Sequence, residues 1–162
     1  MHSARVRAFI GVGANLGDAQ ATVRVAIDAC RQLPASTLHA ASSLYRSAPI
    51  DAGGPDYINA VVAIDTSLSP TELLVHLQRR AAAHGRERSV RNAPRTLDLD
   101  LLLYGDLTMH SAALTLPHPR LHLRAFVLLP LVELAPGVVL PGLGPIQHWL
   151  GRAADQHIEL LA

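Results

Sequence analysis

The chain has 162 residues, of which 49% are hydrophobic and 17% charged, and its formal net charge is +1. This length and composition predict one globular domain over residues 1–162, with enough chain to bury a core. Since no apolar run could cross a membrane and the N-terminus lacks a signal peptide, we expect a cytoplasmic protein without membrane contact. A single cysteine, Cys30, excludes an internal disulfide and a cysteine-based zinc site.

All 14 cationic side chains are arginines. The lack of lysine excludes a Walker A phosphate loop and Schiff-base catalysis, because both need a lysine amine. Any phosphate group would therefore be bound by arginine, histidine, backbone amides or a metal ion.

The first half of the chain predicts a strand, a helix and two further strands. Residues 5–13 are the first expected strand, and apolar residues recurring on one face predict a helix from about 18 to 33. A second strand is expected at 37–47, followed by a loop rich in proline and glycine at 48–56. The third strand, 57–65, alternates between an apolar face and a face that carries a tyrosine and an asparagine.

The second half opens with Ser-Pro-Thr-Glu at 69–72, a capping box with proline at the first helical position. We expect that helix to run to about His84 and to end at Gly85. The fourth strand lies within 93–105. The expected elements after it are a short strand at 113–116 and helices at 125–134 and 146–154.

The order β-α-β-β-α-β is the split βαβ, or ferredoxin-like, arrangement. We therefore expect an α+β fold with a mostly antiparallel sheet and helices on both sides.

The most informative segment for chemistry is the fourth strand, which carries Asp98 and Asp100 between leucines. Residues two apart on a strand point to the same face, so the two carboxylates converge. Carboxylates so close repel one another, and a divalent cation such as Mg²⁺ relieves that repulsion. The alternative is a solvent-exposed strand face, although aspartate is unfavourable within strands.

Two cationic segments accompany this pair. Arginines crowd residues 85–95, which we interpret as a loop, and arginine forks suit phosphate oxygens. Residues 116–126 add His118 and Arg124, although a single histidine is more often structural than catalytic. Magnesium and arginine together favour a polyphosphate ligand.

The polar face of the third strand carries Tyr57 and Asn59, which could stack on a flat ring and bond its edge. An ordinary surface pair is the alternative. The glycine-rich residues 10–18 lack the spacing of a dinucleotide loop, and we interpret them as a tight turn whose amides, or Asn15, could touch a ligand.

Five segments, in this order, resemble the 6-hydroxymethyl-7,8-dihydropterin pyrophosphokinases of folate biosynthesis. They are IGVGANLGD, SSLYRSAP, PDYINAVV, GRERSVRNAPRTLDLDLLLYG and LPHPRLHLRAFVLLPLVELAP. The resemblance covers residues 9–136 and implies an ATP-dependent pyrophosphokinase. Such an enzyme transfers the β,γ-pyrophosphoryl group of ATP to the pterin hydroxymethyl group and releases AMP.

The resemblance also implies roles for individual residues. It makes Asp98 and Asp100 the ligands of two Mg²⁺ ions, and Arg86 and Arg95 the catalytic arginines of a closing loop. The implied ATP site comprises Gln78, Arg86, Arg95, Leu101, Thr115, His118 and Arg124. The implied pterin site comprises Ser47, Ala48, Tyr57, Asn59 and Phe126, with the two aromatic rings enclosing the pterin. The family also suggests a monomer.

The chain departs from the family pattern beside the arginine loop. Members usually carry Ile-Glu before the Gly-Arg at 85–86, but this chain has Arg80-Ala81-Ala82-Ala83-His84 and lacks the acid. Asn92-Ala93 replaces the Trp-Gly found in some members. A lid formed by residues 47–56 and 85–94 could therefore close differently.

Other functions remain open at this point. A paralogue could apply the same Mg-ATP chemistry to another pterin-like alcohol. An RNA-binding ferredoxin-like module would stack bases on sheet aromatics, but here two aspartates would repel the backbone, so we expect no nucleic-acid partner. A binding protein without catalysis would have little reason to keep the whole set of acids, arginines and aromatics.

Overall fold

The computed structural model describes residues 4–48, 55–87 and 97–161. Its helices are α1 (Ala19–Cys30), α2 (Pro70–Glu87), the 3-10 turn η1 (Leu121–Leu123), α3 (Ala125–Leu134) and α4 (Ile146–Arg152). Its longer strands are β1 (Val6–Ala14), β2 (Ser36–Ala41), β4 (Tyr57–Thr66) and β5 (Asp98–Tyr104). Its shorter strands are β3 (Tyr45–Ser47), β6 (Met109–His110), β7 (Thr115–Leu116), β8 (Val139–Leu140), β9 (Gly144–Pro145) and β10 (Ile158–Leu160).

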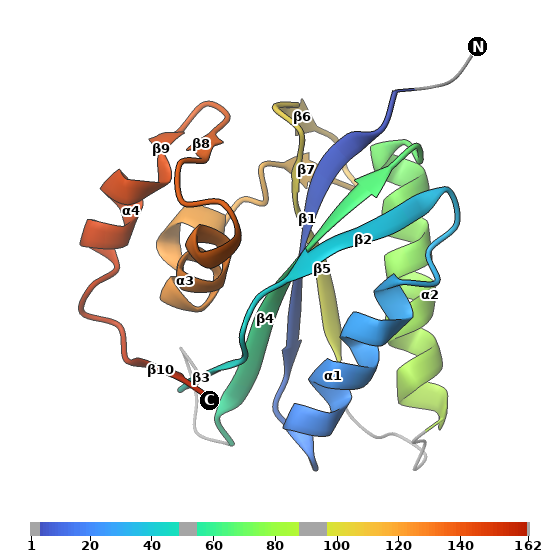
Figure 1. Cartoon of the computed structure of the whole chain (residues 1–162), viewed down its shortest axis with the longest axis horizontal. Helices are drawn as coiled ribbons and strands as arrows, with labels where there is room; N and C mark the ends of the chain where they lie inside the picture. Colours follow the sequence, from blue (N-terminus) through green and yellow to red (C-terminus); the bar gives the residue numbers. More distant parts are fainter. Residues whose placement is uncertain (1–3, 49–54, 88–96, 162) are drawn as a thin grey trace.

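Within these residues the main sheet is antiparallel, with strand order β10-β3-β4-β1-β5 (Figure 1). β2 also pairs with β4, at residues 62–66, whereas β3 pairs with β4 at residues 57–59. The order β5-β1-β4-β2 is the one that a ferredoxin-like β-α-β-β-α-β unit produces. The α+β fold class expected from the sequence is confirmed.

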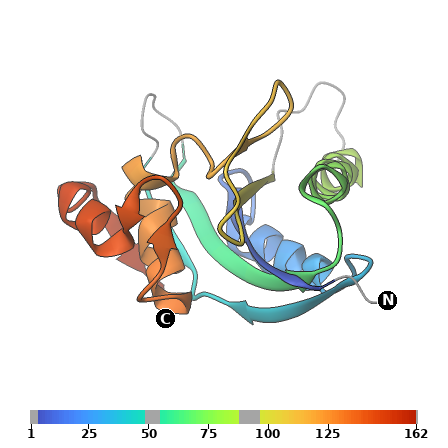
Figure 2. The ribbon, with the colours of Figure 1, turned by 90° about the horizontal axis from the view of Figure 1, so that it is seen from above.

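Helices cover both faces of the sheet, so the molecule has two apolar cores (Figure 2). One core joins α1 and α2 to the sheet face that carries Ile10, Val62 and Leu101. The other joins α3 and α4 to Phe9, Val61 and Leu103 on the opposite face. Successive side chains of a strand alternate between the two cores, except at the register shift in β5, where Leu102 and Leu103 both lie in the α3–α4 core.

The structure corrects the expected second strand, 37–47, which is divided into β2 and β3. A register shift interrupts β2 against β4 between Leu38 and Ala40. Beyond it, the Ser42 hydroxyl accepts a hydrogen bond from the Val61 amide at 2.9 Å, and so takes the place of a backbone acceptor. The strand pairing resumes only at Tyr45.

The predicted end of the second long helix is wrong, because α2 continues through Gly85 to Glu87 and residues 85–87 are helical rather than part of a loop. β1 runs from Val6 to Ala14, so the strand expected at 5–13 is confirmed to within one residue at each end. Gly11 and Gly13 lie inside this strand, so the tight turn inferred for 10–18 does not include them. In that strand both glycines are paired on both sides, because β1 lies between β4 and β5.

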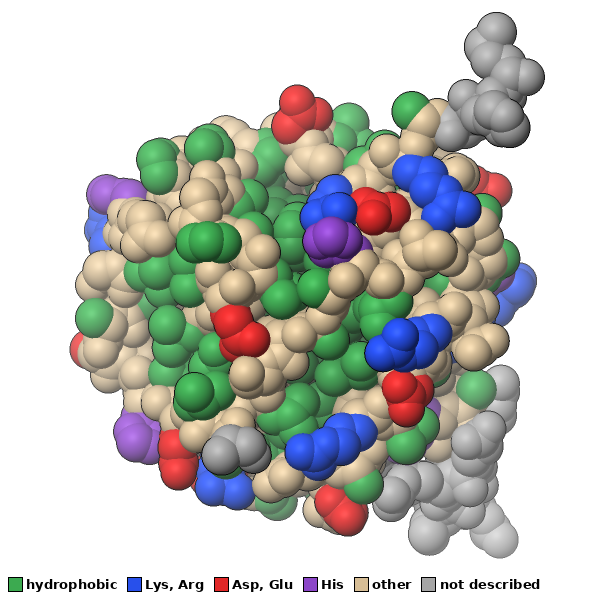
Figure 3. Space-filling view, viewed as in Figure 1, with side chains coloured by type: hydrophobic (Ala, Val, Ile, Leu, Met, Phe, Trp, Pro, Cys, Tyr) green, Lys and Arg blue, Asp and Glu red, His purple; other side chains and the backbone are tan. Residues whose placement is uncertain are grey.

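The strands β8, β9 and β10 had no counterpart in the prediction, since two or three residues give too short a pattern to detect. Of the helices that the structure describes, none is long and apolar enough to cross a membrane. On the face seen in Figure 3, acidic and basic side chains are intermingled and do not gather by sign.

Candidate active site

A pocket of about 420 Å³ opens between the sheet and the start of α3. Its volume lies in the range typical of small-molecule sites. Eight residues predicted from the sequence line it: Ala48, Tyr57, Asn59, Asp98, Asp100, His118, Arg124 and Phe126. The lining extends from Gly11 to Val127, so segments separated by up to 116 positions (11 to 127) meet at one cavity.

The pocket floor follows from the register of three neighbouring strands. Gly13 of β1 is paired with Asn59 of β4 on one side and with Asp98 of β5 on the other. Paired residues share a face, and two strand spacings amount to about 10 Å. Because the central residue has no side chain, Asn59 and Asp98 flank an open floor.

The next row along the sheet repeats this arrangement. Gly11 is paired with Val61 on one side and with Asp100 on the other. A Cβ atom at Gly13 would lie 3.3 Å from Asn59 Oδ1, and one at Gly11 would lie 3.4 Å from Leu102. The two glycines therefore keep the floor low enough to admit a ligand.

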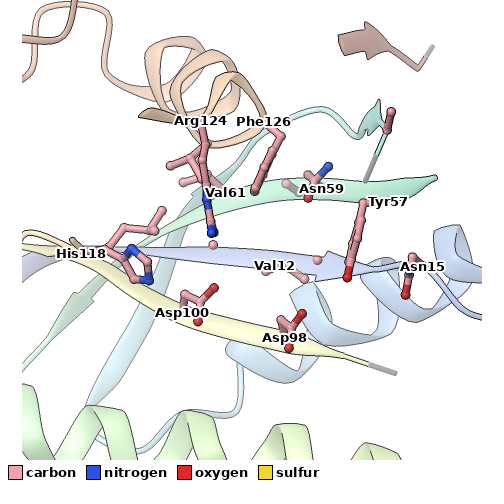
Figure 4. A pocket seen from close by; sticks show the side chains of 16 residues that line it. Val12, Asn15, Tyr57, Asn59, Val61, Asp98, Asp100, His118, Arg124 and Phe126 are labelled. Carbon is pink, nitrogen blue, oxygen red and sulfur yellow. The ribbon is translucent and has the colours of Figure 1, made fainter. Parts of the chain in front are cut away.

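The two carboxylates point into the pocket, as their spacing predicts (Figure 4). Leu97, Leu99 and Leu101 are each at most 8% exposed and lie in the core on the α1–α2 side. Burial of these leucines fixes the opposite face of β5, so Asp98 and Asp100 must turn toward the cavity.

His118 approaches Asp100 from the segment after β7 (Figure 4). Burial lowers the pKa of its imidazole; the Asp100 carboxylate opposes this shift, whereas Arg124 and Arg120 add to it. Its Nδ1 accepts a hydrogen bond of 3.2 Å from the Arg120 amide, which leaves the proton of the neutral ring on Nε2. At neutral pH His118 is therefore a hydrogen-bond donor through Nε2.

Arg124 and Phe126 enter from the start of α3, opposite the carboxylates (Figure 4). The Arg124 guanidinium carbon lies 5.3 Å from the centre of the Phe126 ring, within cation–π range. The start of α3 thus presents a cation and an aromatic surface side by side.

Asn59 is 4% exposed and is held by a neighbour from β3. Its Nδ2 donates a hydrogen bond of 2.8 Å to the Ser47 hydroxyl. Ser47 does not line the cavity, and it acts on the site by orienting the Asn59 amide.

Three other predicted residues also lie outside the pocket lining. Gln78 is exposed on α2, Thr115 lies in β7, and Leu101 is 2% exposed in the core. Arg95 and most of the expected lid, 49–54 and 88–96, lie outside the described residues, as does the side chain of Arg86. Their roles remain predictions.

Sequence reasoning missed part of the apolar lining, notably Leu102 and Val127. Leu102 lies two residues beyond Asp100 on the same strand, so the two-residue alternation of strand side chains could have predicted that it faces the pocket. Asn15, which was expected near a ligand, does line the pocket.

Comparison with known proteins adds independent information. A family model described as 7,8-dihydro-6-hydroxymethylpterin-pyrophosphokinase matches residues 9–136. Proteins named 2-amino-4-hydroxy-6-hydroxymethyldihydropteridine pyrophosphokinase are similar over most of the chain. The one from Pseudomonas aeruginosa is 43% identical over 96% of each chain. The one from Haemophilus influenzae is 42% identical over 93% of this chain and 94% of its own.

Solved structures support the fold. A Plasmodium falciparum HPPK-DHPS structure with pterin and p-hydroxybenzoate has a TM-score of 0.68 at 12% identity. The similarity covers 93% of this chain and 43% of that chain, so the present chain spans less than half of it. At this identity the likeness concerns the fold alone.

Proposed function

The chain belongs to the 7,8-dihydro-6-hydroxymethylpterin-pyrophosphokinase family, and we propose that it transfers pyrophosphate from ATP to 6-hydroxymethyl-7,8-dihydropterin. The products are the pterin diphosphate and AMP, and the reaction belongs to folate biosynthesis. One observation carries the proposal: a single pocket combines paired carboxylates, a histidine and an arginine with two aromatic rings.

The aromatic end of the pocket suits the pterin. Tyr57 of β4 and Phe126 of α3 both point into the cavity from different elements (Figure 4). A flat heterocycle between them would have an aromatic ring on each face. Asn59, oriented by Ser47, offers an amide oxygen and a second amide hydrogen to the donor–acceptor edge of the ring.

The charged end suits the triphosphate. Arg124 would bind phosphate oxygens through its guanidinium fork, and His118 would donate through Nε2 without adding a charge. Both side chains are half-buried in the pocket wall and already face the cavity, and donors placed in advance reduce the reorganisation that the reaction needs.

The carboxylate pair fits Mg²⁺ that arrives with a nucleotide. Among residues 4–48, 55–87 and 97–161 there is no group of three His, Cys, Asp or Glu side chains able to hold a metal. Magnesium, however, commonly uses one or two carboxylates and completes its shell with phosphate oxygens and water. We propose that Asp98 and Asp100 hold two ions in this way; the ions would neutralise phosphate charge and acidify the attacking hydroxyl.

The protein's own part in the transfer is then positioning. Phosphoryl-type transfers need an in-line hydroxyl and stabilisation of charge rather than covalent help. The aromatic pair and Asn59 would orient the pterin hydroxymethyl group toward the carboxylate end. Arg124 and His118 would stabilise the charge that develops on the transferred group.

The remaining assignments follow from the family alone. We propose that Arg86 and Arg95 bind phosphates from a closing loop, and that Gln78, Thr115 and Leu101 border the nucleotide. Because the Leu101 side chain is in the core, its contact would come from the backbone. We also propose that the enzyme is cytoplasmic and monomeric. Size-exclusion chromatography would test the oligomeric state.

Incubation with Mg-ATP and the pterin alcohol, followed by mass spectrometry, tests the reaction class. We expect equimolar AMP and pterin diphosphate. ADP with pterin monophosphate, or no pterin product, would contradict the proposal. A panel of related pterin alcohols in the same assay would measure how narrow the specificity is.

A further inference from the structure

A side chain near the C-terminus bonds the backbone on both sides of Arg124. The Ala125 amide donates to Gln156 Oε1 at 2.9 Å, and Gln156 Nε2 donates to the Leu123 carbonyl at 2.7 Å. Gln156 lies outside residues 9–136, the range that the family model matches. Its two bonds enclose the one residue that joins η1 to α3.

Leu121 and Ala125 pack in the core on either side of this junction, but few other hydrogen bonds hold it. Arg124 is the N-cap residue of α3, with extended backbone angles (φ −120°, ψ 114°) and no capping bond from its side chain. An arginine side chain has no acceptor atom, so it cannot cap the helix itself. The Leu123 amide is bound within η1 and the Arg124 carbonyl within α3. Gln156 faces two backbone groups that neither η1 nor α3 pairs, the Ala125 amide and the Leu123 carbonyl.

The segment that carries Gln156 is itself held in place. Ala153, just before it, is 3% exposed in the core on the α3–α4 side. Beyond it, β10 pairs with β3, with Ile158 opposite Ser47. The Leu161 amide also donates to the Leu44 carbonyl at 2.9 Å. Gln156 is thus fixed between two anchored points and can in turn restrain the corner.

We propose that Gln156 is a positioning residue that sets where Arg124 and Phe126 enter the pocket. The two side chains belong to the phosphate and pterin ends of the cavity, so one amide would align both subsites. This proposal rests on the function proposed above. It requires that loss of the two hydrogen bonds weakens the binding of both substrates more than it weakens the fold.

The direct test is Gln156→Met, which keeps the length of the side chain and removes both hydrogen bonds. We expect kcat/KM to fall roughly 10-fold through higher KM values for both substrates, which is less than the ~100-fold that a full 1 Å misplacement can cost. Gln156→Glu keeps the acceptor for the Ala125 amide but places a carboxylate oxygen against the Leu123 carbonyl, so it should also raise both KM values.

Gln147→Met is the matched control. Gln147 Nε2 donates to the Pro136 carbonyl at 3.0 Å, and this exposed residue of α4 does not line the pocket. Both methionine variants should lose at most a few degrees in melting temperature, while only Gln156→Met should lose activity. Equal activity in the two variants would overturn the proposal.

A double-mutant cycle separates positioning from general destabilisation. If Gln156 acts through Arg124, Gln156→Met should cost much less in an Arg124→Ala background than in wild type. Full additivity would contradict the proposal. Amide hydrogen exchange gives a readout without turnover: residues 124–128 should exchange faster in Gln156→Met, and unchanged exchange would refute the restraint.

The two proposals fail in different ways. If the wild-type chain makes no pterin diphosphate, the proposed function fails, and the role of Gln156 in it fails too. If the wild-type chain is active and Gln156→Met matches it in both KM values, only the positioning role fails.

Discussion

Asp98 and Asp100 are two residues apart on β5, and this spacing places both carboxylates in the pocket. Asp98→Asn and Asp100→Asn should each lower turnover at least ~100-fold, because a neutral amide is a poor ligand for Mg²⁺. Stability should change little, since neither side chain is fully buried. Steady-state assays and thermal unfolding of the same samples would measure both effects. Near-wild-type turnover in both variants would disprove the metal-binding role.

A substitution at Gly13 would test the pterin end of the site separately from the ATP end. In Gly13→Ala the new methyl group would lie 3.3 Å from Asn59 Oδ1, closer than most such contacts, so Asn59 must shift. We expect the KM for the pterin to rise roughly 10-fold, as misplacement of a substrate-positioning group predicts, with the KM for ATP nearly unchanged. Gly151→Ala is the control, because no atom lies within 4 Å of its new Cβ. An equal rise in both KM values would contradict this role for Gly13.

At the scale of elements, α2 depends on its capping box. The Glu72 amide donates to Ser69 Oγ at 3.2 Å, and the Ser69 amide donates to Glu72 Oε1 at 2.8 Å. Ser69→Ala should therefore cost about 1 kcal/mol in the free energy of unfolding, measured by urea denaturation. Activity per folded molecule should stay unchanged, because Ser69 does not line the pocket. A loss of activity in fully folded Ser69→Ala would contradict this expectation and show that α2 affects the pocket.

An ion pair between β1 and β4 makes a pH-dependent contribution to the stability of the fold. Arg7 and Asp65 are register partners, with Arg7 Nε 2.7 Å from Asp65 Oδ1. The hydrogen bond from Arg7 is the largest cause that lowers the pKa of the Asp65 carboxyl below its ordinary value. The unfolded chain therefore binds this proton more readily, so the stabilisation exists above the ordinary pKa and is lost as pH falls through the lowered value.

Asp65→Asn should accordingly lower the melting temperature slightly at pH 7, since the pair is partly exposed to solvent. The difference from wild type should shrink below about pH 4, near the ordinary aspartate pKa. Calorimetric scans from pH 7 to pH 3 would measure it. A difference that is constant over this range would exclude the ion pair as its source.

At the scale of the whole molecule, ligand binding should report the magnesium requirement without turnover. A ligand present at 100 times its dissociation constant stabilises the folded state by about 2.7 kcal/mol. We therefore expect Mg-ATP to raise the melting temperature by roughly 5–10 °C for a chain of this size. ATP with EDTA should raise it far less, and Asp100→Asn should remove most of the difference. Equal stabilisation with and without Mg²⁺ would contradict the proposed metal site.

Local sequence patterns were sufficient to predict the order of the main elements and which face each strand buries. Leu97, Leu99 and Leu101 could be assigned to a core because apolar alternation has a period of two, and burial of one face commits the other. The same reasoning turned Asp98 and Asp100 toward a common volume. The local pattern was sufficient for this prediction because the backbone geometry of a strand fixes on which face each successive side chain lies.

Which distant residues meet could not be predicted from local patterns, because it depends on strand register and packing. The rows Asn59–Gly13–Asp98 and Val61–Gly11–Asp100 depend on the register of three strands, which no local pattern encodes. The break between β2 and β3 depends on a bond from Val61 to Ser42, and the corner at Arg124 on a bond from Gln156. These contacts form only when packing brings remote segments together. The candidate site residues could therefore be predicted from the sequence, whereas the distances between them depend on the fold.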